Sequence, residues 1–287
     1  MDIIHTVSAL RAHLQAPENK GRAIGFVPTM GNLHEGHIDL VRIARDRVGM
    51  DGLVVMSIFV NRLQFGPKED FDKYPRTLAD DGEKCRQAGV DVIFAPDEHE
   101  MYPEPQGYVI EPPEIQHILD GAVRPGHFRG VATVVMKLLN MVQPSVAVFG
   151  KKDYQQCRLL DTMVRQFNMP IKIILAETIR ADDGLALSSR NIYLSKAERK
   201  EAPQLFVALQ AIKTYLLTGR RDFDSIEAEA LNRLTMRGWQ PDYLTIRCQS
   251  DLLEPIASDE VQIMPLVILG ACRLGTTRLI DNLEVLL

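Results

Sequence analysis

Residues 23–48 read AIGFVPTMGNLHEGHIDLVRIARDRV, and this stretch decides the predicted fold. The apolar run at residues 23–27 is typical of a buried strand, which we expect to end at Pro28. From Ile38 to Val48 the apolar residues recur at helical spacing, with three arginines and an aspartate on the opposite face. The stretch therefore predicts a buried strand, a glycine-containing turn and an amphipathic helix in succession.

Apolar runs and helical patterns continue to alternate over the first two thirds of the chain. Strands buried on both faces and separated by helices indicate a parallel sheet with right-handed crossovers. We therefore predict a doubly wound α/β domain, with ligands at the carboxyl ends of its strands. Further strands are expected at residues 53–60, 90–95, 107–110, 145–149 and 171–176, and further helices at 78–88, 131–142 and 154–167. The apolar helix at 131–142 is expected in the core rather than at an interface.

The pattern changes near residues 176–185, where Asp182, Asp183 and Gly184 interrupt it. We predict two domains, residues 1–178 and residues 179–287, the second being a smaller α+β unit. Its helices are expected at 197–217 and 225–236, and its strands at 243–248, 261–271 and 278–283.

The composition is that of an ordinary globular protein and excludes several functional classes. Among 287 residues, 33 are Lys or Arg and 38 are Asp or Glu, and the net charge of −5 argues against a nucleic-acid-binding surface. No apolar run approaches the roughly 18 residues that span a membrane, and the charged N-terminal segment does not fit a signal peptide. The cysteines, at positions 85, 157, 248 and 272, lack zinc or disulfide spacing, so we expect reduced thiols in a cytoplasmic protein.

The turn after the first strand carries two histidines, His34 and His37, in an HxGH pattern. Gly31 and Gly36 allow the backbone to approach a ligand, and the following helix N-terminus presents N–H groups to an anion. The histidines could hold nucleotide phosphates and stabilise charge as a phosphorus–oxygen bond breaks. An isolated HxGH is more often an ordinary polar turn, and its position at a strand end favours function. A metal pair is less favoured because no third ligand is evident.

Two later segments also combine small or glycine residues with cations. Gly150, Lys151, Lys152 and Asp153 follow a predicted strand; a lysine could pair with phosphate, whereas Asp153 also suits a helix N-cap. The segment 187–190 places two serines beside an arginine, which suits either a polyphosphate clamp or a solvated linker turn.

Two loops between these segments offer further candidates. Gln64 could present an amide to a hydroxyl or carboxylate. Phe65 and Phe128 are more often packing residues, and His127 is either a ligand or a structural histidine whose hydrogen bonds are made within the protein.

Together these segments closely resemble the pantoate–β-alanine ligase, or pantothenate synthetase, family. The matching segments occur in family order between residues 24 and 282, and their order makes the resemblance much more specific than HxGH alone. They are PTMGNLHEGH (28–37), FVNRLQFG (59–66), RPGHFRGV (124–131), FGKKDYQQ (149–156), DGLALSSRN (183–191) and LGTTRLIDN (274–282).

The resemblance implies a Rossmann-like N-terminal domain that binds ATP and pantoate, a C-terminal lid domain that closes over ATP, and a homodimer. It implies that ATP, (R)-pantoate and β-alanine are converted to pantothenate, AMP and pyrophosphate through a pantoyl adenylate. Magnesium is implied as well, held mainly by the ATP phosphates.

The resemblance also assigns residues. His37 is implied as a proton donor, and we expect His34, His37 and Lys152 to offset charge during the first step. Gln64 and Gln156 are expected to bind pantoate, and Gln64 also lies near β-alanine. The residues expected to bind ATP are Met30, Gly31, Asn32, Leu33, His34, Glu35, Gly36, His37, Gly150, Lys151, Lys152, Asp153, Ile179, Leu187, Ser188, Ser189 and Arg190.

Three positions depart from the family pattern. Lys151 replaces a usual Glu, Arg62 a usual Pro, and Leu187 a common Met. Lys151 adds charge that could alter ATP affinity, and Arg62 leaves the Gln64 loop less constrained in φ.

Other functions are also compatible with parts of the pattern. A nucleotidyltransferase would share HxGH but not explain the pantoate glutamines, and a tRNA synthetase fragment would require a basic RNA surface. A non-catalytic nucleotide sensor would bind ATP without turnover.

Overall fold

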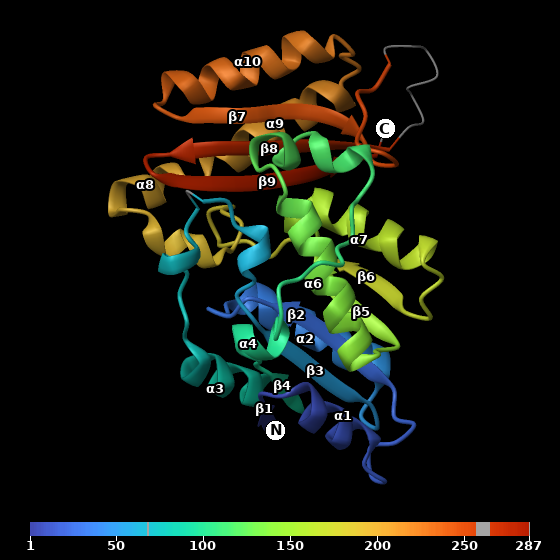
Figure 1. Ribbon diagram of the computed structural model, residues 1–287. Helices are drawn as coiled ribbons and strands as arrows, with labels where there is room; N and C mark the ends of the chain where they lie inside the picture. The colour runs from blue at the N-terminus through green and yellow to red at the C-terminus, as the bar shows by residue number, and fades with distance from the viewer. Residues whose placement is uncertain (68, 257–264, 287) are drawn as a thin grey trace. The chain divides into compact units, whose positions relative to one another are not determined.

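The computed structural model describes residues 1–67, 69–256 and 265–286. Its internal contacts divide the chain into two compact units (Figure 1). The first comprises Met1–Lys151 and Gln156–Glu177, and the second comprises Lys152–Gln155 and Thr178–Leu287. A short turn at the start of one helix therefore belongs to the second unit, although the residues on both sides of it belong to the first.

A six-stranded, wholly parallel sheet forms the centre of the first unit, as the sequence predicts. The strand order is β1-β4-β3-β2-β5-β6. The strands are β1 (Asp2–Ile4), β2 (Ile24–Thr29), β3 (Leu53–Ile58), β4 (Val92–Phe94), β5 (Val146–Gly150) and β6 (Lys172–Ala176). Because β2 connects towards β3 on one side and β5 lies on its other side, the topological switch point falls at β2 and β5.

Helices cover both faces of this sheet, which confirms the doubly wound prediction. One core cluster joins α1 (Val7–Gln15), α6 (His127–Val142) and α7 (Tyr154–Gln166) to the sheet, and another joins α2 (Glu35–Val48) and α3 (Leu78–Ala88). Successive strand residues alternate between the clusters: Phe26 belongs to the first and Val27 to the second. The short helices α4 (Glu98–Met101) and α5 (Asp120–Val123) lie in the connections.

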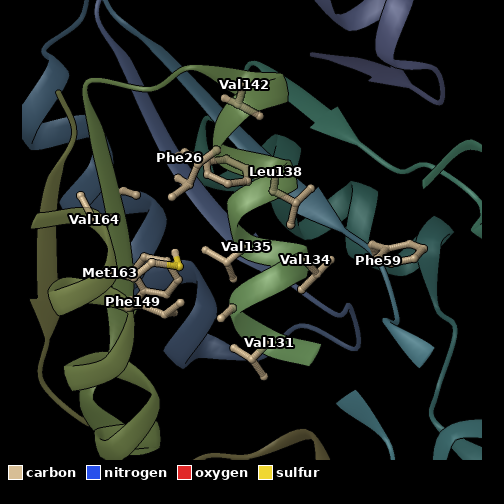
Figure 2. Close-up of a cluster of buried hydrophobic side chains, with 14 of the residues drawn as sticks. Phe26, Phe59, Val131, Val134, Val135, Leu138, Val142, Phe149, Met163 and Val164 are labelled. Carbon is tan, nitrogen blue, oxygen red and sulfur yellow. The ribbon is translucent and has the colours of Figure 1, made fainter. Parts of the chain in front are cut away.

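The apolar helix α6 is part of the core, as predicted. Figure 2 shows Val131, Val135 and Leu138 along one helix, beside Phe26 of β2 and Phe149 of β5. These five side chains are at most 6 % exposed. The helix begins at His127, earlier than its apolar pattern indicates, and this places His127 in its first turn.

Several predicted elements are wrong or incomplete. Residues 107–110 form no strand; the Ile110 N–H instead donates to Thr133 Oγ1 of α6 at 3.0 Å. β2 does not end at Pro28 but continues through Thr29, with Pro28 in register with Ser57 of β3. The N-terminal β1 and α1 are not among the predicted elements.

The second unit has an antiparallel sheet covered by helices, in agreement with the predicted α+β class. Its strands β7 (Gln240–Cys248), β8 (Leu266–Leu274) and β9 (Thr277–Val285) lie in that order. The expected helix at 197–217 is two helices, α8 (Lys196–Glu201) and α9 (Gln204–Leu217), because Pro203 cannot donate a helical hydrogen bond. The helix α10 (Phe223–Met236) packs on the same core. Residues 261–264 of the strand expected at 261–271 lie outside the described residues.

Two further sequence expectations concern cysteines and membranes. All four cysteines are buried, and no disulfide joins them. Within residues 1–67, 69–256 and 265–286, no helix is both long and apolar enough to cross a bilayer.

Candidate active site

Three of the predicted ligand-binding segments follow neighbouring strands of the parallel sheet. The segment 30–37 follows β2, the segment 59–66 follows β3, and Gly150 ends β5. Because β3, β2 and β5 are adjacent and parallel, their carboxyl ends lie at one edge of the sheet. The fold therefore places these segments together at the switch point, where doubly wound sheets bind ligands.

The turn after β2 has a backbone conformation that requires glycine. Gly31 has φ 83°, and a Cβ there would lie 3.0 Å from Ile58 Cγ2 and 3.1 Å from Asp81 Oδ2. Asn32 follows in the left-handed region with φ 50°, which asparagine tolerates better than most residues. This compact turn leads the chain from β2 directly to the N-terminus of α2.

A buried carboxylate holds this turn from a distant segment. Asp81 of α3 is 0 % exposed and accepts from the Asn32 N–H at 2.9 Å and the Leu33 N–H at 2.8 Å. The Thr77 hydroxyl donates to the same carboxylate at 3.0 Å, and Lys84 Nζ donates to the Leu33 carbonyl at 2.7 Å. Sequence patterns alone do not single out Asp81, since an acidic residue in the first turn of a helix is also explained by the helix dipole.

The two histidines of HxGH lie together at the start of α2, as predicted. His34 occupies the N-cap position, and its ring centroid lies 4.1 Å from that of His37. The His34 main-chain N–H donates to His37 Nδ1 at 3.3 Å. In the neutral ring, this bond places the His37 proton on Nε2, which can donate to an oxyanion. Two imidazoles and a helix N-terminus thus form an environment suited to phosphate.

Gln64 lies next to the turn after β2. Its Oε1 accepts from Asn61 Nδ2 at 3.0 Å, and its Nε2 contacts Met30 Sδ at 3.4 Å. Asn61 is in turn fixed by the Tyr102 hydroxyl, which donates to Asn61 Oδ1 at 2.7 Å. The structure therefore brings the glutamine expected to bind pantoate to the segment expected to bind ATP. Burial raises the pKa of Tyr102, so this hydroxyl remains a donor.

His127, Phe65 and Phe128 have structural positions. Both ring nitrogens of His127 make hydrogen bonds within the protein, to the Gln64 carbonyl and to Arg124. Phe65 packs edge-on against Phe71 at 5.4 Å between centroids, and Phe128 is 2 % exposed.

The end of β5 carries a charge pair that the sequence does not reveal. Lys151 Nζ lies 2.6 Å from Glu177 Oε1, just after β6. The positive charge at position 151 is thus paired with a carboxylate of its own unit. Gln156 follows in the first turns of α7 and belongs to the same unit.

The second unit holds the remaining expected ATP residues. They lie on the short segment that contains Lys152 and Asp153, and on a hairpin that contains Ile179 and residues 187–190. The Leu187 N–H donates to the Ile179 carbonyl at 3.0 Å, so these two residues are neighbours in a hairpin. Ser188 caps the short helix Ser189–Tyr193, its Oγ accepting from the Arg190 N–H at 3.3 Å. Asn282 of β9 donates from Nδ2 to the Lys152 carbonyl at 3.0 Å.

Another pair in this unit ties the hairpin to the same strand. Arg180 makes a two-pronged ion pair with Asp281, at 2.6 and 2.9 Å, and its guanidinium lies 3.7 Å from the Phe206 ring centroid. Asp281 and Asn282, from the segment LGTTRLIDN, therefore contact both ATP segments of this unit. Asn282 binds the Lys152 carbonyl, and Asp281 binds Arg180, which directly follows Ile179. Neither residue was a predicted site residue.

No group of three or more His, Cys, Asp or Glu residues in the described parts of the chain is arranged to hold a metal ion.

Comparison of the sequence with known proteins identifies the family to which this chain belongs. Residues 2–284 match the pantoate-beta-alanine ligase family. A pantothenate synthetase from Leptothrix cholodnii is 56 % identical over 285 residues, covering 99 % of this chain and 100 % of that protein. The chain belongs to the pantoate–β-alanine ligase family.

Solved structures agree with this family assignment. A pantothenate synthetase from Thermus thermophilus is 44 % identical, with a TM-score of 0.90 and complete coverage of both chains. A pantoate–β-alanine ligase from Francisella tularensis, described as complexed with beta-gamma ATP and β-alanine, is 34 % identical. Its TM-score is 0.82, covering 99 % of this chain and 97 % of that one. As a family member, this chain is an ATP-dependent ligase that joins pantoate to β-alanine.

Proposed function

We propose that the ligation proceeds through a pantoyl adenylate formed at the switch point of the parallel sheet. The observation that carries this proposal is the contact between Gln64 Nε2 and Met30 Sδ, at 3.4 Å. It supports placing the pantoate carboxylate beside the nucleotide, in reach of its α-phosphate.

In the first step, the pantoate carboxylate attacks the α-phosphorus of ATP, and the bond to the bridging oxygen of pyrophosphate breaks. The carboxylate is already ionised near neutral pH, because carboxyl pKa values lie near about 4, so no base is required. The barrier arises instead from bringing two anions together. His34 and His37, at the N-terminus of α2, and Lys152 would offset this repulsion and the charge on the departing pyrophosphate.

Gln64 and Gln156 would hold pantoate through amide hydrogen bonds, and Gln64 would also lie near β-alanine. In the second step the β-alanine amine attacks the acyl carbon, the bond to AMP breaks, and pantothenate and AMP are formed. Exclusion of water from the acyl adenylate would protect it from hydrolysis.

The expected ATP-binding residues belong to both units of the chain. The segment 30–37 and residues Gly150 and Lys151 belong to the first unit, whereas Lys152, Asp153, Ile179 and residues 187–190 belong to the second. The family resemblance supports a role for the second domain as a lid over ATP. A magnesium ion carried by the ATP phosphates would neutralise part of their charge. Such an ion requires no cluster of three protein ligands, and the described residues contain none.

The assembly and environment are also proposals. We expect a homodimer in the cytoplasm without a nucleic-acid partner, which the family resemblance and the net charge of −5 support. Sedimentation equilibrium at micromolar concentration would measure the assembly state directly.

The deciding experiment measures AMP and pyrophosphate release from ATP while pantoate and β-alanine are omitted in turn. The adenylate route predicts release of both products with the complete mixture, and transfer of oxygen-18 from the pantoate carboxylate to AMP. Formation of pantothenate without AMP and pyrophosphate release, or without oxygen-18 in AMP, would refute the adenylate route.

A further inference from the structure

The segment that carries Gln64 is held through its main chain by the region that begins α6. His127 Nδ1 lies 2.8 Å from the Gln64 carbonyl oxygen, and Arg124 Nη2 lies 3.5 Å from the same atom. His127 is 9 % exposed. A main-chain carbonyl of the proposed pantoate site is thus bound by a buried imidazole from a segment more than sixty residues away.

The direction of each hydrogen bond follows from the donors present. Arg124 Nη1 lies 2.9 Å from His127 Nε2, and a guanidinium has donors only. His127 Nε2 must therefore accept, and a neutral ring carries its proton on Nδ1. His127 Nδ1–H then donates to the Gln64 carbonyl, so this contact has one defined polarity.

A carboxylate just beyond Gln64 holds the arginine in place. Glu69 accepts from Arg124 Nε at 2.6 Å and from Arg124 Nη2 at 2.8 Å, the paired geometry that a guanidinium fork favours. Glu69 Oε2 also accepts from the Gly66 N–H at 3.1 Å. Burial alone would raise the pKa of Glu69, but the hydrogen bond and charge of Arg124 outweigh it and the pKa is lowered. Arg124 therefore contacts both the Gln64 carbonyl and the Glu69 carboxylate, and His127 contacts the Gln64 carbonyl.

The close approach of Leu63 and Gln64 to α6 adds a steric constraint. A Cβ at Gly130 would overlap the Leu63 carbonyl and lie 2.7 Å from Gln64 Cα. The Gly130 carbonyl accepts from Asn61 Nδ2 at 3.2 Å, and the same Asn61 amide donates to Gln64 Oε1. Main chain and side chain of Gln64 are thus fixed relative to one helix.

We propose that His127, Arg124 and Glu69 are positioning residues for Gln64, which hold its main chain so that its amide meets pantoate in a preset orientation. None of the three needs to touch substrate. The proposal rests on the proposed role of Gln64 in pantoate binding. Preset orientation lowers the ordering cost of binding, so loss of the network weakens pantoate capture rather than ATP capture.

The test compares three substitutions of His127 by steady-state kinetics with pantoate and ATP varied separately. His127→Ala is expected to raise the KM for pantoate about tenfold, the effect of losing one hydrogen bond near 1.4 kcal/mol, with the KM for ATP changed less than about twofold. In His127→Asn, the amide nitrogen can replace Nδ1 as donor to Gln64, so the pantoate KM should return towards the original value. In His127→Gln, the amide lies nearer the Nε2 position and should not restore it.

Controls separate this proposal from the role of Gln64 itself. Gln64→Ala is measured in parallel: an unchanged pantoate KM there would refute the proposed role of Gln64. If Gln64→Ala raises that KM but His127→Ala changes the two KM values equally or neither, the positioning role is overturned. His99→Ala, at an exposed histidine of α4, should leave both KM values unchanged. Should His127→Ala not fold, Arg124→Lys keeps the charge but loses the fork, and it must raise the pantoate KM selectively.

Discussion

The neutral, buried imidazole of His127 makes the stability of the fold dependent on pH. Burial, and then the charge of Arg124, lower the pKa of His127 from 6.5 to about 4. Below pH 6.5 the unfolded chain takes up a proton at this position, whereas the folded chain does not until about pH 4. The free energy of unfolding therefore falls as the pH falls through this window, and the full contribution is present above pH 6.5.

The size of the effect follows from the two pKa values. A difference between 6.5 and about 4 corresponds to about 3 kcal/mol when both states have reached their limits. At pH 5 the ring is mostly protonated in the unfolded chain and still mostly neutral in the folded chain, so about 2 kcal/mol of unfolding free energy should already be lost. His127→Asn removes the titrating group while keeping a donor to the Gln64 carbonyl.

Urea unfolding of the original protein and of His127→Asn at pH 7.5, 6.0 and 5.0 would measure this contribution. The single tryptophan, Trp239, lies in the second unit, so far-ultraviolet circular dichroism is the better probe of the first. We expect the original protein to lose about 2 kcal/mol more than the variant between pH 7.5 and pH 5.

Parallel loss in both proteins would refute the reasoning, because it would mean that His127 titrates alike in the folded and unfolded chains. Nuclear magnetic resonance of labelled histidines gives an independent check. The chain has seven histidines, and the signal missing from His127→Asn identifies this one. It should keep the Nδ1–H form down to pH 5; a midpoint near 6.5 would contradict the burial argument.

Four other substitutions test the nucleotide side of the site. Asp81→Asn should lower the unfolding free energy by about 2 kcal/mol and raise the KM for ATP, because the turn after β2 loses a charged acceptor; an unchanged melting curve and KM would contradict this. His37→Ala should lower kcat far more than it weakens ATP binding measured by calorimetry, whereas equal losses would exclude a transition-state role. Lys151→Ala should raise the KM for ATP less than Lys152→Ala does, because Lys151 is paired with Glu177. The reverse order would contradict the expectation that Lys152, rather than Lys151, offsets the charge of the nucleotide.

The sequence predicts most of the first unit because its strands are buried on both faces and read as continuous apolar runs. The three residues of β1 are too few to show such a run, and this edge strand is defined by its pairing with β4. The segment 107–110 reads as a strand but finds its hydrogen-bond partner on a helix, at Thr133. The break between α8 and α9 follows from Pro203, whose missing N–H can be read from the sequence alone.

The site is predictable where chemistry and local sequence coincide, and it is missed where a residue acts through distant main chain. His34, His37 and Gln64 stand in distinctive segments at strand ends, and the strand order brings those segments together. Asp81 reads as a common helix-start residue, since the main-chain N–H groups that it accepts from lie nearly fifty residues away in the chain. For His127 the sequence leaves a ligand role and a structural role open, and only its two partners in space decide between them.

The two loops that meet at the switch point are held from opposite faces of the sheet. Asp81 holds the turn before α2 from α3, which packs on one face, and His127 holds the Gln64 loop from α6, which packs on the other. Both Asp81 and His127 bind main-chain atoms, so the side chains carried by the two loops are oriented before a substrate arrives. In the proposed mechanism, two anions that repel each other would thus meet N–H donors whose directions are already set, and such preorganisation lowers a barrier of electrostatic origin.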